Sequence, residues 1–331
     1  MEFRSNTGSP AADRDRAPSR QEPLRLVETR CALCGSAAAE PAAAGPDFEY
    51  ATAPGEFCFV RCRECAHLYL CPRPAPSELS RIYPPSYYAF AGPGNALVAR
   101  VRRRWEGGKV RLYREVLGEG PRRLLDVGCG NGRFLSLLRE FGPRDWQLVG
   151  VDFDADAVAR CRELGFEAHA GRVEDLPLER GGFDAVIMLQ LIEHVEDPAS
   201  ISRSVYRLLE PGGVFIVETP NLGGLDHRLF RGRWWGHYHF PRHWNLFSTA
   251  SLRRMLEAAG FRIDRSECLI STSSWTISIH NYLIDRGWPA GFARFFHWQN
   301  PLLLGFFVVF DTLRTRLGME TSNQRMIARK P

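Results

Sequence analysis

The stretch from Leu124 to Leu135 reads LLDVGCGNGRFL, and it is the most informative part of the sequence about the fold. A short apolar run contains one acid, Asp126, and three glycines, Gly128, Gly130 and Gly132, then lead into an amphipathic helix pattern. Glycine allows a tight turn with positive φ and lets a ligand approach the backbone closely. The stretch is therefore typical of the first strand, turn and helix of an open α/β sheet that binds a nucleotide-like cofactor.

Alternating strand and helix patterns follow this turn and predict an α/β fold with a Rossmann-like seven-stranded sheet. The expected strands are 123–127, 147–151, 166–170, 183–189, 214–218, 262–269 and 324–330, with helices over 132–141, 155–164, 199–209 and 249–259. The segment between the last two strands is rich in Trp, Phe and Leu. Because a structureless loop of that length is uncommon, we expect a helical insertion over about residues 272–320.

The acid before the glycines indicates the charge of the ligand. Asp126 would repel a pyrophosphate, whereas it would attract the ammonium and sulfonium groups of S-adenosylmethionine. Asp152 ends the second strand about 20 residues further on, where a carboxylate can accept hydrogen bonds from both ribose hydroxyls. Phe153 can then cover the adenine, and Cys129 lies within the turn itself. Two alternatives remain for these residues, a tight turn without a ligand and a helix cap at Asp152.

Four sequence blocks, in this order and spacing, resemble the class I methyltransferase family over residues 120–330. They are the glycine turn, the strand that ends at Asp152, GRVEDLP at 171–177, and FDAVIMLQ followed by EHV at 183–195. The resemblance implies adenine recognition through the backbone near Val173 and methionine contacts near Leu189 and Gln190. Many relatives carry an acid where this chain has Arg172.

The Glu193-His194 pair in the last block has two interpretations. It either takes part in catalysis or packs and forms hydrogen bonds beneath the cofactor loop. The position after the fourth strand reads LQLI at 189–192 instead of an Asn- or Asp-Pro-Pro-Tyr motif. That difference disfavours an enzyme that methylates the exocyclic amines of nucleic-acid bases.

Two cysteine pairs precede the sheet and predict a metal site. Cys31-x2-Cys34 and Cys62-x2-Cys65, with 27 residues between the pairs, supply the four thiolates of a tetrahedral structural zinc and leave no ligand position open. The first residues carry no apolar leader pattern, so we expect a reducing cytoplasm, where such pairs are metal sites more often than disulfides.

These observations divide the chain into four expected parts: a disordered tail at 1–27, a zinc ribbon at 28–76, a helical linker at 77–118, and the methyltransferase domain at 119–331. The block at 62–88, which contains CRECAHLYLCPRP and IYPPSYY, resembles the leader of a bacterial subgroup of these methyltransferases. That subgroup is associated with sugar, polysaccharide and natural-product pathways.

The acceptor side is expected directly after the fifth strand, where ligands of open α/β sheets bind. Residues 227–243 hold four of the nine histidines among Trp, Tyr and Arg side chains. Methyl transfer to a hydroxyl or carbon acid needs a positioned nucleophile and removal of its proton, a task that suits histidine near neutral pH. His243, His239 and Tyr238 are therefore the candidate catalytic residues.

The same segment leaves two other interpretations open, a hydrogen-bonded aromatic loop and a second metal site suggested by the H-x-H-x3-H spacing. PRHWNLFS at 241–248 is similar to an H-x3-F segment of natural-product sugar C-methyltransferases, in which the histidine is proposed as the base. The similarity places His243 first. The large extra C-terminal domain of those enzymes is absent from this sequence, which favours O-methylation over C-methylation.

The expected function is methyl transfer from S-adenosylmethionine to a hydroxyl of a small-molecule, sugar, glycan or lipid-linked acceptor. Alternatives are a sugar C-methyltransferase, a ribosomal-RNA methyltransferase whose basic helix near 102–104 holds phosphates, and a non-catalytic zinc-ribbon partner protein. The net charge of +5 over 331 residues is too small to demand a nucleic-acid partner. The apolar run at 301–310 is shorter than the roughly 20 residues that span a bilayer, although peripheral membrane contact stays open.

Overall fold

The structure is a computed structural model that describes residues 22–84, 96–297 and 300–331, without the side chains of 96–106. Residues 1–21 of the tail expected over 1–27, the last residues of the block at 62–88 from position 85 on, and the arginine side chains at 102–104 therefore lie outside the described residues. Within the described part, no helix combines the length and the apolar character needed to cross a membrane.

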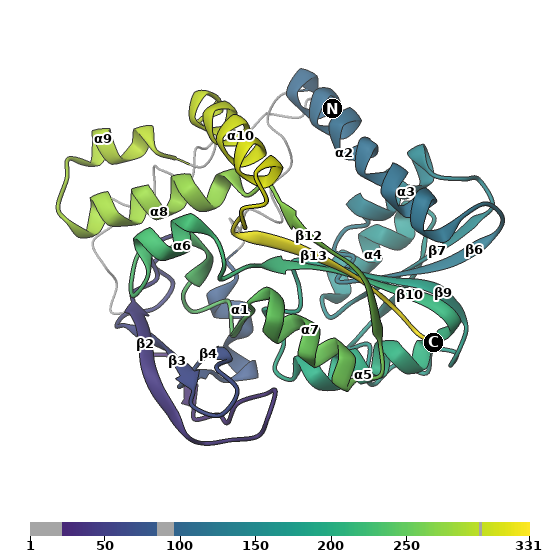
Figure 1. The fold of residues 1–331 in the computed structure, drawn as a ribbon, viewed down its shortest axis with the longest axis horizontal. Helices are drawn as coiled ribbons and strands as arrows, with labels where there is room; N and C mark the ends of the chain where they lie inside the picture. The colour runs from purple at the N-terminus through teal and green to yellow at the C-terminus, as the bar shows by residue number, and fades with distance from the viewer. Residues whose placement is uncertain (1–21, 85–95, 298–299) are drawn as a thin grey trace, which may run out of the picture.

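A seven-stranded sheet forms the centre of the molecule, and it confirms the predicted fold class (Figure 1). Its strands are β6 (Arg122–Val127), β7 (Trp146–Asp152), β8 (Glu167–Ala170), β9 (Phe183–Leu189), β10 (Leu209–Pro220), β12 (Arg262–Leu269) and β13 (Asn323–Arg329). Their order is β12-β13-β10-β9-β6-β7-β8. Only β13 runs antiparallel to both of its neighbours, so the carboxyl ends of the other six strands meet at one edge.

Helices cover both faces of this sheet because successive strand residues point to opposite sides. Leu125 packs with α5 (Pro198–Leu208) and α7 (Thr249–Ala258) on one face. Leu124 packs with α2 (Ala96–Leu117), α3 (Arg133–Phe141) and α4 (Ala155–Glu163) on the other. The two buried layers are continuous apolar cores, as expected for a largely parallel sheet.

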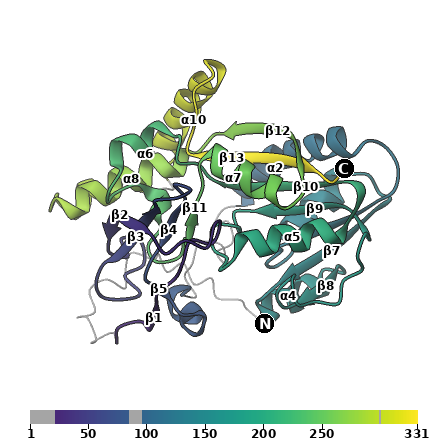
Figure 2. The same ribbon diagram turned by 60° about the horizontal axis from the view of Figure 1, so that its bottom comes forward.

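The N-terminal module forms a second, four-stranded sheet in the order β11-β4-β3-β2. Three strands come from the module, β2 (Ala39–Gly45), β3 (Phe57–Cys62) and β4 (Leu68–Leu70), whereas β11 (Asn245–Leu246) comes from the segment after β10. This arrangement differs from the separate ribbon expected over 28–76. Figure 2 shows β11 beside β4, at the join between the two parts.

The module shares its hydrophobic core with the segment that follows β10, because a unit of this size buries too little surface alone. Its buried side chains include Phe59 and Leu70 from the module and Trp235, Phe240 and Trp244 from the later segment. The tail boundary also differs from the prediction. Residues 26 and 27 form β1 (Leu26–Val27), which pairs with β5 (Arg73–Pro74) by backbone hydrogen bonds.

Short helices connect these parts. The expected linker begins with a 3-10 turn, η1 (Pro76–Glu78), and α1 (Leu79–Ile82), and ends with α2. After β10 come α6 (Leu225–Phe230) and a second 3-10 turn, η2 (Gly236–Tyr238). The predicted insertion before the last strand is helical: α8 (Thr272–Asp285) contacts α6, α9 (Ala290–Phe295) and α10 (Pro301–Arg316) (Figure 1).

Candidate active site and metal centres

The glycine turn joins β6 to α3 and needs glycine for two physical reasons. Gly128, Gly130 and Gly132 all have positive φ, at 83°, 51° and 78°, where other residues are strained. A Cβ on Gly128 would also lie 2.9 Å from a methyl carbon of Leu191. The turn is held against β7, because the amides of residues 128 and 129 both donate to the carbonyl of Val151. The backbone of the turn is therefore held rigidly, and its three glycines present no side chains to a ligand.

Two carboxylates flank this turn at the ends of β6 and β7. Asp126 is buried, and among the described residues its Oδ2 has no hydrogen-bond partner. Burial and the charge of Asp152 raise the pKa of Asp126 to about 8. Asp152 accepts hydrogen bonds from the amides of Gly130 at 2.8 Å and Asp154 at 3.0 Å. A buried carboxylate oxygen without a donor fits a cationic ligand, so these residues fit S-adenosylmethionine.

The other predicted cofactor residues lie at the same edge of the sheet. Phe153 follows Asp152 with 63% of its side chain exposed, as a lid over a flat ring would need, while Val173 is buried in the core. Burial raises the pKa of the Cys129 thiol, which lies inside the turn. Leu189 ends β9, and Gln190 turns the chain with φ of 53° while its side-chain amide donates to Asn323.

Four histidines gather beyond the carboxyl ends of the strands. The ring centroid of His243 lies 4.6 Å from that of His194, 5.0 Å from that of His239 and 6.5 Å from that of His237. Burial lowers the pKa of His194 to about 3 and that of His237 to about 4, and it lowers the pKa of His243 well below its usual value. These three imidazoles are neutral at physiological pH.

Hydrogen bonds orient each ring of this histidine cluster. The Nδ1 of His243 lies 2.7 Å from the carbonyl of His237, and the Nδ1 of His194 lies 3.0 Å from the carbonyl of Arg242. Because a carbonyl only accepts, Nδ1 of His243 carries the proton and its Nε2 carries the lone pair. The Nδ1 of His194 also lies 2.9 Å from the hydroxyl of Tyr83, which can donate or accept. The Nδ1 of His239 lies 2.6 Å from a carboxylate oxygen of Glu49.

The structure does not place Tyr238 where a catalytic residue would lie. Its hydroxyl accepts a hydrogen bond from the amide of Gly232 at 3.1 Å, and its ring packs against Phe59 and Phe240. The side chain of Tyr238 therefore lies in the shared core, where it is buried. Sequence reasoning missed Glu49, because nothing in the surrounding GPDFEY marks it as the partner of a histidine 190 residues away.

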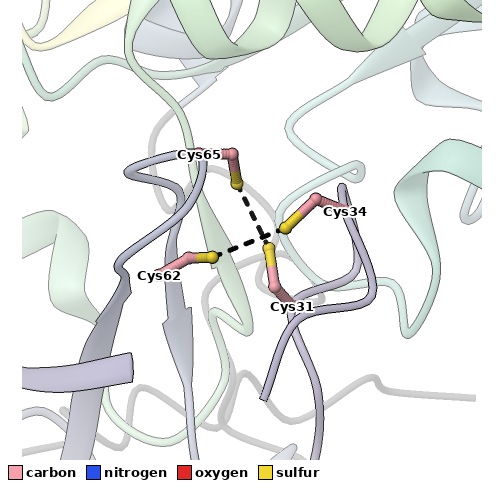
Figure 3. Close-up of side chains that lie close together, drawn as sticks. All are labelled: Cys31, Cys34, Cys62 and Cys65. Atoms are coloured by element: carbon pink, nitrogen blue, oxygen red, sulfur yellow. Dashed lines mark hydrogen bonds between the residues drawn. The ribbon is translucent and has the colours of Figure 1, made fainter. Parts of the chain in front are cut away.

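The four predicted cysteines converge as the spacing indicated. Cys31 and Cys34 lie in the loop before β2, Cys62 ends β3, and Cys65 lies in the turn between β3 and β4. All four sulfurs point toward one point (Figure 3). The sulfurs of Cys31 and Cys65 are 3.4 Å apart, and those of Cys34 and Cys62 are 3.5 Å apart. These separations are too long for a disulfide and close to the roughly 3.8 Å edge of a tetrahedron with 2.3 Å Zn–S bonds.

The sheet order, the glycine turn and the acids that follow β6 and β7 define the class: a Rossmann-like methyltransferase fold with a nucleoside-cofactor site. A family model described as a methyltransferase domain matches residues 98–266. That range is half of the chain, so the chain belongs to this methyltransferase family.

Two curated relatives support the family. The chain is 34% identical over 149 residues to a protein of Mycolicibacterium smegmatis named as a probable S-adenosylmethionine-dependent methyltransferase, covering 43% of this chain and 53% of that protein. It is 38% identical over 106 residues to the ubiquinone biosynthesis O-methyltransferase of Xanthomonas oryzae, covering 30% and 43%. The chain thus spans about half the length of the curated relatives it matches.

One solved structure among those similar in fold is a SAM-dependent methyltransferase from Archaeoglobus fulgidus. It has a TM-score of 0.45 and 23% identity, and the match covers 69% of this chain and 94% of that chain.

Proposed function

We propose that the chain transfers a methyl group from S-adenosylmethionine to a hydroxyl oxygen of a small-molecule, sugar or lipid-linked acceptor. The observation that carries the proposal is the buried, unpartnered Oδ2 of Asp126 beside the glycine turn. The cofactor supplies an electrophilic methyl group on a sulfonium. Asp126 balances the positive charge, Asp152 holds the ribose, and the N-terminus of α3 receives the methionine carboxylate.

The histidine cluster supports a hydroxyl acceptor, because oxygen must lose its proton before or during attack. Of the two candidate bases, His239 is favoured over His243. Glu49 stabilises the imidazolium that His239 becomes when it accepts a proton. Burial disfavours protonation of His243, because it lowers the pKa of this imidazole well below the usual value for histidine. His239 therefore takes the acceptor proton, and Glu49 holds its ring.

A structural zinc at Cys31, Cys34, Cys62 and Cys65 completes the proposal. The four sulfurs are placed as tetrahedral thiolate ligands would be, and no position is left for a substrate. Such an ion would stabilise the sheet that includes β11. It would therefore hold the segment that carries His239 and His243 as well as the N-terminal module itself.

Peripheral contact with a cytoplasmic membrane surface is the proposed route to a lipid-linked acceptor. Leu302, Phe306 and Val309 on α10 expose more than half of their side-chain surface. Arg294 and Arg316 are exposed at the ends of α9 and α10. Aromatic and aliphatic side chains with arginines nearby suit the interface of an anionic bilayer.

The test is transfer of labelled methyl from S-adenosylmethionine into extracts of the source cell, separated into RNA, lipid and small-molecule pools. Label in the lipid or small-molecule pool supports the proposal, and NMR of the product then identifies an O-methyl group. Asp126→Asn should abolish the transfer, whereas Asp145→Asn, at an exposed site, is the matched control.

Other outcomes point to the alternatives. Label in RNA would replace the proposal with a ribosomal-RNA methyltransferase, and a new C-methyl group would favour a sugar C-methyltransferase. A chain that binds no S-adenosylmethionine in calorimetry would favour the non-catalytic partner protein.

A further inference from the structure

A second group of metal-ligating side chains lies outside the cysteine cluster. Glu193, His194 and His243 each offer one ligand atom, and these three atoms lie within 4.8 Å of one another. One carboxylate and two imidazoles form the ligand set of many divalent metal sites that keep open positions. This group differs from the metal site suggested by the H-x-H-x3-H spacing, because it contains His243 but neither His237 nor His239.

The side chain of Glu193 gives independent evidence for a ligand at this group. Its side chain is fully buried, and its Oε2 accepts a hydrogen bond from Thr219 at 2.9 Å. Its Oε1 has no hydrogen-bond partner within the part of the chain that the structure describes. A buried carboxylate oxygen without a partner is destabilising, because burial removes its hydration and no hydrogen bond replaces it; a bound cation removes that cost.

The two histidines are oriented as metal ligands are. His243 directs its Nδ1 at the carbonyl of His237, and His194 directs its Nδ1 at the carbonyl of Arg242 and the hydroxyl of Tyr83. In both rings Nε2 is therefore the nitrogen that faces a metal. Over the described residues, neither Nε2 makes a hydrogen bond.

The backbone holds the three residues together from two distant segments. The amides of Trp244 and Asn245 both donate to the carbonyl of Glu193, at 2.7 and 2.9 Å. This pairing places His243 beside the Glu193-His194 pair. Leu191 of the same turn packs against Gly128, so the group lies next to the cofactor turn.

We propose that Glu193, His194 and His243 bind one divalent transition-metal ion, which coordinates the acceptor through two neighbouring oxygen atoms. The proposal rests on the proposed function for its chemistry. Three protein ligands leave positions open, so an acceptor with vicinal hydroxyls, such as a catechol or a sugar diol, can chelate the ion. His243 then serves as a ligand and His239 as the base, which divides the roles within the histidine cluster.

The bonds of the transfer step balance with these groups alone. Coordination makes the acceptor hydroxyl more acidic, and its proton passes to His239. An oxygen lone pair forms the new O–C bond with the methyl carbon. The S–C bond of the donor breaks, and its electron pair stays on sulfur, which gives S-adenosylhomocysteine.

In the experiment, Mn²⁺ is titrated into the purified full chain, and the concentration of unbound Mn²⁺ is measured by electron paramagnetic resonance. Mn²⁺ is the right probe because it prefers oxygen and imidazole ligands to thiolates, so the cysteine cluster keeps its own metal. We expect one Mn²⁺ per chain. Glu193→Gln and His243→Ala should each weaken binding by at least about 100-fold, more than the loss of a second-shell partner costs.

Further variants keep the test decisive if a buried substitution unfolds the chain. Thr219→Val keeps all three ligands and should weaken Mn²⁺ binding about 10- to 100-fold through the orientation of Glu193. His169→Ala is the matched control, because His169 also lies 3.0 Å from a glutamate but outside the group. Circular dichroism and thermal denaturation without cofactor show which variants remain folded.

The titration uses neither cofactor nor acceptor, so its outcome is independent of the proposed function. No bound Mn²⁺, or binding that survives in folded Glu193→Gln and His243→Ala, overturns the metal site. Loss of binding in these variants, with binding retained in His169→Ala, supports it, even if no methyl transfer is found.

Discussion

Binding of S-adenosylmethionine should depend on pH through Asp126. Its carboxyl is buried with an unpartnered Oδ2, and burial together with the charge of Asp152 raises its pKa to about 8. At pH 7 most of the protein without cofactor therefore carries a neutral Asp126. The cationic cofactor favours the ionised form, so binding is linked to release of a proton.

The size of the effect follows from the pKa. Each pH unit below the pKa of Asp126 costs about 1.4 kcal/mol of binding free energy, because the carboxyl must first be ionised. The affinity for S-adenosylmethionine should therefore rise about ninefold from pH 6 to 7 and about fivefold from pH 7 to 8. Above about pH 9 the contribution of Asp126 is constant. Asp126→Asn keeps the shape of the side chain and removes its charge, so this variant should bind more weakly and lose this part of the pH dependence.

Isothermal titration calorimetry of both proteins from about pH 6 to 9 makes the measurement. The cofactor's own amino group titrates near pH 8 as well. Because both proteins share that contribution, the ratio of their dissociation constants isolates Asp126. A ratio that stays constant with pH, or an Asn variant that binds as tightly as the wild type at pH 8, would show that the charge of Asp126 does not contribute to cofactor binding.

Three more predictions test the metal, the buried ion pair and the base. Metal analysis should find one zinc at the cysteines, lost in Cys31→Ser and kept in Cys268→Ser; a chain purified without zinc would contradict the site. Asp47→Asn leaves a fully buried guanidinium without its bidentate partner and should cost about 3 to 5 kcal/mol in urea denaturation; a loss below about 1 kcal/mol would show that the pair is dispensable. Glu49→Gln should lower kcat with little change in cofactor affinity, because Glu49 contacts His239; unchanged kcat would exclude that histidine as the base.

The sheet could be predicted from the sequence because its signals are local. A strand, an acid, three glycines and an amphipathic helix follow one another without a gap at 124–135. Positive φ at each glycine matches the turn that this pattern implies. The cysteine pairs are local in the same sense, since each C-x2-C closes within one turn of chain.

The acceptor side could be predicted only as a region. Residues 227–243 were singled out by their density of histidine and aromatic residues, yet Tyr238 proved to be part of a core and Glu49 was not found. The pairing of Glu49 with His239 joins residues 190 positions apart. The buried pair of Asp47 and Arg242 joins residues 195 positions apart. No local pattern encodes such a contact.

The α/β class, the cofactor turn and the two C-x2-C pairs were predictable because each depends on residues that are neighbours along the chain. The extension of the N-terminal sheet by β11 and the position of His243 beside Glu193 and His194 were not, because they join distant segments. The physical reason is burial. The small N-terminal module lacks enough apolar surface to fold alone, so it packs on the segment after β10 and positions the histidines carried there.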